Sequence, residues 1–277
     1  MEVLVRQAVY GDREAAVCAE IKAVRGLRYL DDVWDQFYND QSGELLVGEI
    51  DGKVVAVGKY TLLPDSSAWL ETLRVDPEFQ GRGIGKAFYR RFLERAAMQE
   101  VSVLGMYTTT NNAVSKGLAE RFGFSLSATY RGASLKVANS SADTARFIPL
   151  SPSEAVLKLM PVIDIWDNHV VLNRTFYPAT ADNFAAMARE GKVLYNPSSG
   201  SLCILGYRFL RERDLHLAFL QGDIDEVIAF ALKEACLRGH QGLSIMFPPK
   251  LTAIENYLAE KGFAIDPTDC IVMTKRM

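Results

Sequence analysis

Hydrophobic and polar residues in the first half of the chain change their periodicity repeatedly, which predicts alternating strands and helices. Apolar residues at every second position predict a strand, and apolar residues three or four positions apart predict a helix. The predicted elements, in chain order, are strand 3–8, helices 12–23 and 30–38, strands 45–50 and 54–62, a strand ending at 75, helix 84–99, strand 101–107, a helix after 112, and one or two strands over 125–137. We therefore expect an α/β protein of the α+β type, built around a mixed sheet.

The second half of the chain repeats this plan in reduced form. Its predicted elements are strands 192–195, 202–210 and 215–220, helix 224–238, strand 243–247, helix 251–261 and a last strand that runs to about 273. Gly81 and Gly222 are 141 residues apart, and Gly123 and Gly262 are 139 apart. Near-equal spacing of this kind indicates duplicated domains. We predict a first domain over 1–140, a polar, proline-containing linker over 141–153 and a second domain over 154–277.

Composition narrows the classes of function. The chain has 277 residues, 49% of them hydrophobic, and a net charge of −3, which argues against a dedicated nucleic-acid binder. No apolar run approaches the roughly 20 residues of a membrane span, and the first residues lack the order of a signal peptide. The four cysteines have no paired spacing and the three histidines are scattered, so we expect reduced thiols, a cytoplasmic protein and no metal site.

Residues 80–85, Gln-Gly-Arg-Gly-Ile-Gly, place a glycine at every second position between a predicted strand and a predicted helix. Asp76-Pro77 ends the strand, because proline has no amide hydrogen for a sheet ladder. A glycine-rich turn that enters a helix exposes unpaired amide hydrogens at the positive end of the helix dipole. The sequence therefore predicts an anion site suited to phosphate. Its spacing differs from those of the dinucleotide fingerprint and of the P-loop.

This hexapeptide matches the motif [Gln/Arg]-x-x-Gly-x-[Gly/Ala], so the chain resembles the GCN5-related N-acetyltransferases (GNAT). A second family motif is matched more loosely by Asn112, Ser115, Leu118 and Gly123-Phe124. The resemblance covers about residues 1–137 and, with the repeat, implies two tandem acyl-CoA N-acyltransferase (GNAT) domains. The second is expected to be a degenerate copy without a phosphate loop. At 221–226 it has lost two of the three glycines and carries three carboxylates that would repel a pyrophosphate.

The resemblance also implies which residues contact acetyl-CoA, here a cosubstrate. The loop amides would hold the pyrophosphate, and main-chain groups at the end of the strand would pair with the pantetheine where that strand splays from strand 101–107. The predicted cofactor-binding residues are Leu73, Val75, Gln80, Gly81, Arg82, Gly83, Ile84, Gly85, Lys86 and Asn112. Lys86 equally fits a solvated helix face, and for Asn112 the cap of the following helix is the favoured role.

Acetylation of an amine needs a neutral amine, a donor for the developing oxyanion and a proton for the leaving thiolate. Glu71 is the predicted general base, four residues before Val75 and thus on the same face of an unbroken strand; a surface ion pair is the alternative. The resemblance implies the Val75 amide as the oxyanion donor. Family members often have a proton-donating tyrosine where this chain has Ala119. The substitutes considered are Ser115, Tyr107, Tyr130 and solvent.

Together these features predict an N-acetyltransferase that moves an acetyl group from acetyl-CoA to a primary amine of a small molecule or peptide, directly and in a ternary complex. The expected partner is that amine acceptor, with neither nucleic acid nor a membrane, and the formation of a homodimer is left open. Two alternatives remain: a non-catalytic acetyl-CoA sensor or regulatory module, and a scaffold for dimerisation. The sequence does not specify the acceptor, because acceptor loops vary freely on this fold.

Overall fold

A computed structural model describes residues 3–24, 26, 28–137 and 146–277. They form two compact units. The first is made of the described residues within 3–108, 112–126 and 273–277, and the second of 109–111, 127–137 and 146–272. The continuous part of the first unit thus ends earlier than the predicted domain 1–140, because strand β6 (Ser125–Lys136) begins in the first unit and continues in the second. Part of the predicted linker, 141–145, lies outside the described residues, and the rest carries strand β7 (Ile148–Pro149) and the start of a helix.

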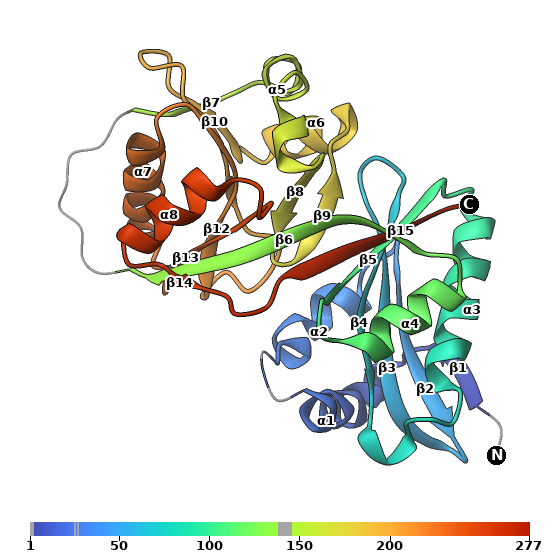
Figure 1. The fold of residues 1–277 in the computed structure, drawn as a ribbon. Helices are drawn as coiled ribbons and strands as arrows, with labels where there is room; N and C mark the ends of the chain where they lie inside the picture. The colour runs from blue at the N-terminus through green and yellow to red at the C-terminus, as the bar shows by residue number, and fades with distance from the viewer. Residues whose placement is uncertain (1–2, 25, 27, 138–145) are drawn as a thin grey trace. The chain divides into compact units, whose positions relative to one another are not determined.

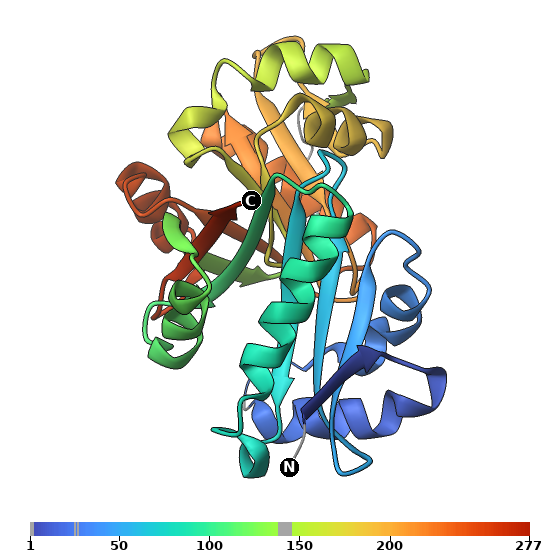
Figure 2. The same cartoon turned by 90° about the vertical axis from the view of Figure 1, so that its right-hand side faces the viewer.

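The sheet of the first unit has the order β1-β2-β3-β4-β5. Its strands are β1 (Val3–Gln7), β2 (Glu44–Ile50), β3 (Lys53–Leu62), β4 (Ala68–Val75) and β5 (Val103–Thr109). Neighbours are antiparallel except β4 and β5, which are parallel. Helix α3 (Ile84–Met98) covers one face, and helices α1 (Arg13–Ala23) and α2 (Leu30–Tyr38) cover the other (Figures 1 and 2). Helix α4 (Ala113–Arg121) follows β5, and short 3₁₀ turns lie at Tyr10–Asp12 and Pro77–Phe79.

Helix α3 lies close to the sheet because the strands present glycines to it. A Cβ atom on Gly58 would lie 2.8 Å from the ring of Phe88 and 3.2 Å from that of Phe92. A Cβ atom on Gly48 would lie 2.8 Å from Phe88 as well. Both phenylalanines are fully buried, so the two rings occupy the space that side chains would otherwise fill on β2 and β3.

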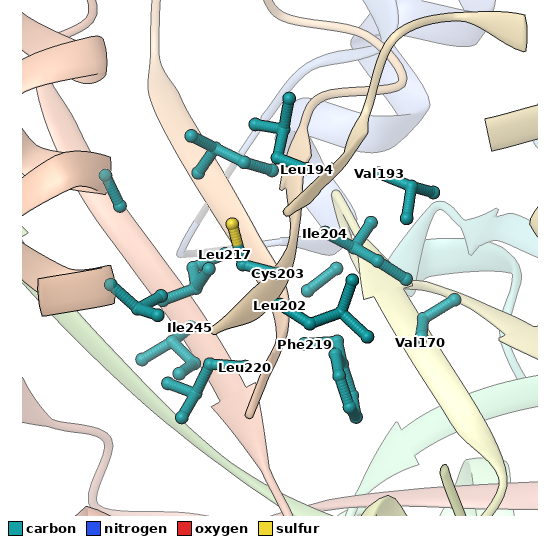
Figure 3. Close-up of a cluster of buried hydrophobic side chains, with 14 of the residues drawn as sticks. Val170, Val193, Leu194, Leu202, Cys203, Ile204, Leu217, Phe219, Leu220 and Ile245 are labelled. Carbon is teal, nitrogen blue, oxygen red and sulfur yellow. The ribbon is translucent and has the colours of Figure 1, made fainter. Parts of the chain in front are cut away.

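The sheet of the second unit has the order β6-β13-β12-β11-β10-β7, in which only β12 and β13 are parallel. The strands are β10 (Val193–Tyr195), β11 (Leu202–Gly206), β12 (Asp214–Gln221) and β13 (Gly242–Phe247), with β14 (Ala264–Ile265) also paired to β6. Helices α7 (Ile224–Leu237) and α8 (Thr252–Glu260) agree with the predicted ones. Figure 3 shows part of the apolar core, which includes Cys203, Ile204, Phe219 and Ile245.

Several elements of the second unit were not predicted. They are helices α5 (Pro152–Leu159) and α6 (Ala181–Arg189), a 3₁₀ turn at Ile163–Trp166, and a separate hairpin of β8 (His169–Leu172) and β9 (Thr175–Pro178). Each is short, so few positions carry its periodicity. The last strand, β15 (Cys270–Arg276), extends past the predicted end near 273, and its residues from Met273 onward belong to the first unit.

The two units share one order of elements. The run β2-β3-β4-α3-β5-α4 corresponds to β10-β11-β12-α7-β13-α8, with two antiparallel pairs followed by a parallel pair in both. In both units the register of the second antiparallel pair shifts once, between Val57 and Lys59 and between Ile204 and Leu205. The tandem arrangement stays a prediction, which this common topology supports.

Replacing Gly58 with alanine should lower the free energy of unfolding by about 1–3 kcal/mol, because the new methyl group would overlap the rings of Phe88 and Phe92. Urea denaturation of the full chain measures the change. Gly11→Ala is the matched control, since a Cβ atom there meets nothing within 4 Å. Equal stability of the two variants would contradict this account of the packing.

Candidate active site

Strand β4 contains a bulge at Thr72. Glu71 lies opposite Lys59 and Arg74 lies opposite Val57, so β4 has one residue more than β3 between these two pairs. Thr72 has a φ of 60°, in the left-handed region that β-branched residues rarely adopt. A bulge of this kind changes the alternation of side chains along its strand. Here it places Glu71 and Arg74, rather than Glu71 and Val75, on the same face of β4.

This bulge corrects the spacing argument for Glu71. Val75 lies opposite Ala56, which is on the same face of β3 as Gly58, the face that packs against α3. Glu71 lies opposite Lys59, which is on the other face of β3. The expectation that Glu71 and Val75 share a face is therefore wrong, because it assumed an unbroken strand. The roles predicted for these two residues do not depend on a shared face, since Val75 was expected to act through its backbone amide.

Strands β4 and β5 separate at their carboxyl ends. Their parallel ladder runs from Ala68 opposite Leu104 to Leu70 opposite Met106 and includes no later residue, although β4 continues to Val75. The main chain of β4 at Leu73 and Val75 is thus outside the ladder with β5. This is the splay that the resemblance implied, and it leaves peptide groups at the end of β4 available for a ligand.

The Glu71 carboxylate is 7% exposed and accepts a hydrogen bond of 2.5 Å from the hydroxyl of Thr61. Beside it, the hydroxyls of Tyr29 and Thr72 lie 2.7 Å apart. Burial raises the pKa of Tyr29, the negative charge of Glu71 raises it further and the positive charge of Arg74 opposes this. Tyr29 is therefore a neutral hydroxyl at physiological pH. Glu71 is thus buried, whereas the alternative prediction placed it in an ion pair at the surface.

The connection between α1 and α2 is anchored where it approaches this cluster. The buried carboxylate of Glu20 accepts hydrogen bonds from the backbone amides of Tyr29, at 3.2 Å, and Leu30, at 3.0 Å. These bonds fix the backbone at Tyr29, whose hydroxyl contacts the strained residue of the bulge. Glu20, Tyr29 and Thr72 were not among the predicted site residues.

The end of β4 is anchored to α1. The Asp76 carboxylate accepts a hydrogen bond of 3.1 Å from the amide of Glu78 and one of 2.7 Å from Lys22 Nζ. Burial of Asp76 opposes its ionisation, but these two hydrogen bonds outweigh that effect and hold its pKa below the usual value. The turn that leads into the glycine loop is consequently held at a fixed place beside the strand.

The three glycines of the loop meet two different requirements. Gly81 and Gly83 have φ values of 78° and 85°, and a Cβ atom at either would meet nothing within 4 Å. Their requirement is conformational, since other residues rarely adopt such angles. At Gly85 a Cβ atom would lie 2.8 Å from Cδ2 of Leu118, so that glycine allows α3 and α4 to approach closely.

The first turn of α3 is open to an anion. Its N-cap is Gly83, which makes no side-chain capping bond, and the turn contains no acidic residue. The first turn of α7 in the second unit contains Asp225 and Glu226, and its N-cap Asp223 accepts a hydrogen bond from the amide of Glu226. Hydrogen bonds from Ser199, Ser201 and Asn196 hold the pKa of Glu226 below its usual value. The positive end of the α7 dipole is thus already balanced by carboxylates of the chain itself.

Two predicted loop residues use their side chains to build the loop. Gln80 Nε2 donates a hydrogen bond of 3.2 Å to the carbonyl of Val75, and Arg82 Nη2 donates one of 3.2 Å to the carbonyl of Glu78. The Arg82 guanidinium also lies 5.0 Å from the centre of the Phe79 ring. We expected these two residues to act through backbone amides and charge, so their part in shaping the loop was missed.

The remaining predicted residues lie around the same loop. Ile84 is buried under the first turn of α3, and Lys86 is exposed on that turn. Asn112 caps α4, because its side chain accepts a hydrogen bond of 3.1 Å from the amide of Ser115. The alternative role of Asn112 as a helix cap is thus confirmed, and its contact with acetyl-CoA stays a prediction.

The candidates for the general acid differ in their surroundings. Ala119 is fully buried, and its methyl group has no proton to donate. Tyr130 is also fully buried, belongs to the second unit and donates its hydroxyl hydrogen to the carbonyl of Trp166. Burial raises the pKa of Tyr130, which makes it unsuitable as a proton donor. Tyr107 stacks on Trp69, with ring centroids 6.4 Å apart, one residue beyond the ladder between β4 and β5.

The part of the chain that the structure describes has neither a metal-binding cluster nor a membrane-spanning helix. Among those residues, no group of three or more histidine, cysteine, aspartate or glutamate side chains is arranged to hold a metal ion. In the same residues, no helix combines the length and the apolar character needed to cross a membrane.

Residues 15–124 match the family model described as the acetyltransferase (GNAT) family. This segment is a GNAT domain. It contains the bulge, the glycine loop, α3 and α4, and its family acetylates amine acceptors with acetyl-CoA. The comparison with curated proteins gave no match.

Several solved structures each match almost the whole chain, including the GNAT domain. A Pyrococcus horikoshii protein provisionally classed as an acetyltransferase is 17% identical, with a TM-score of 0.65 over 99% of this chain and 89% of that one. A GCN5-related N-acetyltransferase from Sphaerobacter thermophilus is 14% identical, with a TM-score of 0.62 over 99% and 95%. One from Kribbella flavida is 12% identical, with a TM-score of 0.52 over 99% and 71%. At these identities the similarity shows a shared fold that extends beyond the GNAT domain.

Replacing Gly83 with glutamate should weaken the binding of acetyl-CoA by about tenfold or more, because it places a carboxylate beside the expected phosphates. Isothermal titration calorimetry with acetyl-CoA measures the dissociation constant. Gly52→Glu is the matched control: Gly52 has a φ of 78° in the hairpin turn between β2 and β3, and a Cβ atom there also meets nothing within 4 Å. An equal loss of affinity in both variants would contradict our placement of the phosphate site.

Proposed function

We propose that the protein is an N-acetyltransferase that moves an acetyl group from acetyl-CoA to a primary amine of a small molecule or peptide, by direct transfer in a ternary complex. The observation that carries the proposal is the open first turn of α3, which has two left-handed glycines, no side-chain cap and no acidic residue. It follows directly after a strand whose last peptide groups are outside the ladder with β5. The phosphates of acetyl-CoA suit the open helix turn, and the amides of its pantetheine arm suit the free peptide groups of the strand.

In the proposed reaction, Glu71 first accepts a proton from the bound ammonium group, and the neutral nitrogen then attacks the thioester carbonyl. The amide of Val75 donates a hydrogen bond to the oxyanion that forms. The carbon–sulfur bond then breaks as the carbonyl re-forms, and the acetyl group stays on nitrogen, which loses its second proton to solvent. The departing thiolate takes a proton from solvent, or from Tyr107, which solvent then reprotonates. No covalent intermediate with the protein is required, and Cys203 and Cys270 are buried in the second unit.

A non-catalytic acetyl-CoA sensor is the second candidate function. The observation that favours it is the buried Ala119, which removes the hydroxyl often found at that position. The burial of Glu71 next to the open end of β4 favours catalysis instead, because a carboxylate held there can accept a proton from a bound amine.

Replacing Glu71 with glutamine should lower kcat by about 10²–10⁴-fold, because the amide cannot accept the proton, while the dissociation constant of acetyl-CoA changes little. Thiol release in the presence of a panel of amines measures kcat, and calorimetry measures the affinity. Glu44→Gln is the control, since Glu44 is also a buried carboxylate but pairs with Arg91 on α3, at 2.6 Å. Wild-type protein that binds acetyl-CoA yet releases no thiol with any amine would support the sensor instead.

A further inference from the structure

Arg74 is a charged residue of β4 to which the site described so far gives no function. The bulge at Thr72 places it on the same face as Glu71, because the two lie opposite Val57 and Lys59, which are two residues apart on β3. Residues two apart on a strand are separated by about 7 Å. The side chains of Arg74 and Glu71 thus leave β4 as neighbours on the face covered by α1 and α2.

The Arg74 guanidinium has unused hydrogen-bonding capacity. Among the described residues, its one hydrogen bond runs from Nη1 to the carbonyl of Leu73, at 3.1 Å. Its Nε is buried and has no partner in this part of the chain, and Arg74 forms no salt bridge with any described carboxylate. A buried donor of a charged group that stays unpaired costs stability, so such a group calls for an explanation. The Nε atoms of Arg91 and Arg95 are buried without a described partner as well, but Arg91 is paired with Glu44 through Nη2.

Both charges act on the same hydroxyl. Burial raises the pKa of Tyr29 most strongly, the charge of Glu71 raises it further and the charge of Arg74 lowers it. Tyr29 also contacts Thr72, the bulge residue between Glu71 and Arg74 in sequence. A negative and a positive side chain therefore lie near one hydroxyl, with no salt bridge between them among the described contacts. A ligand with one cationic and one anionic group would match this pair.

We propose that the acceptor is an amine that also carries an anionic group, a carboxylate or a phosphate, and that Arg74 binds this anion while Glu71 receives the amine. The inference rests on the proposed function. Guanidinium binds such anions with two parallel N–H···O bonds, which orient the ligand as well as holding it. An acceptor without the anion would leave Arg74 unpaired, so the site would select against it.

The test uses matched acceptors and thiol release from acetyl-CoA. The pairs are the common amino acids against their carboxamides, and phosphoethanolamine against ethanolamine. In one of the two pairs, wild-type protein should favour the anionic amine over its neutral counterpart by at least about tenfold in kcat/KM. A preference in the amino-acid pair indicates that the site binds a carboxylate, and a preference in the ethanolamine pair indicates a phosphate. Arg74→Gln should reduce kcat/KM for that acceptor by about 10- to 100-fold, while its neutral counterpart changes by less than about twofold. Arg74→Lys should restore part of the loss.

Arg90→Gln is the control variant, since Arg90 is an exposed arginine on α3, and it should leave the preference unchanged. The inference is overturned if wild-type protein prefers the neutral amines, if Arg74→Gln keeps the preference, or if Arg74→Gln instead weakens the binding of acetyl-CoA. Acetylation of neutral amines alone would leave the proposed function standing. The absence of thiol release with every amine in the panel would contradict the function and this inference together.

Discussion

The bulge at Thr72 is the constraint on which the geometry of the candidate site depends. One additional residue in β4 turns Glu71 and Arg74 to one face and Val75 to the other, and the ladder with β5 ends just before it. A non-glycine residue in the left-handed region costs about 1–3 kcal/mol, so the surrounding structure must hold it in place. The contact with the Tyr29 hydroxyl, which Glu20 fixes through the backbone, is the interaction that does so.

The two units show how one architecture gives opposite electrostatics at the start of a helix. In the first unit the helix after the parallel-pair strand begins with glycines and no carboxylate. In the second unit the corresponding helix begins with Asp223, Asp225 and Glu226, and serine and asparagine side chains hydrogen-bond to Glu226. The helix dipole is the same in both units, so the side chains of the first turn decide what balances its positive end. In the first unit an external anion can do so, and in the second unit carboxylates of the chain do so.

The sequence predicted the structure well where a physical requirement restricts the type of residue at a position. Left-handed turns need glycine at 81 and 83, so the loop could be predicted, and strong periodicity predicted α2 and α3 almost to the residue. The bulge does not restrict residue type in this way, since threonine is an ordinary strand residue. The prediction that Glu71 and Val75 share a face was wrong for that reason. The side-chain bonds of Gln80 and Arg82 depend on how the turn folds back, which spacing alone does not reveal.

The path of β15 has a consequence for how the protein is made. Residues Met273–Met277 belong to the first unit, and the amide of Met277 donates a hydrogen bond of 3.0 Å to the carbonyl of Ser102. A ribosome synthesises the chain from its amino terminus, and domains generally fold as they emerge. The first unit therefore lacks its last strand residues until the second unit, which ends at Val272, has been translated. Its sheet, in which β15 is the neighbour of β5, reaches its final form only after that point.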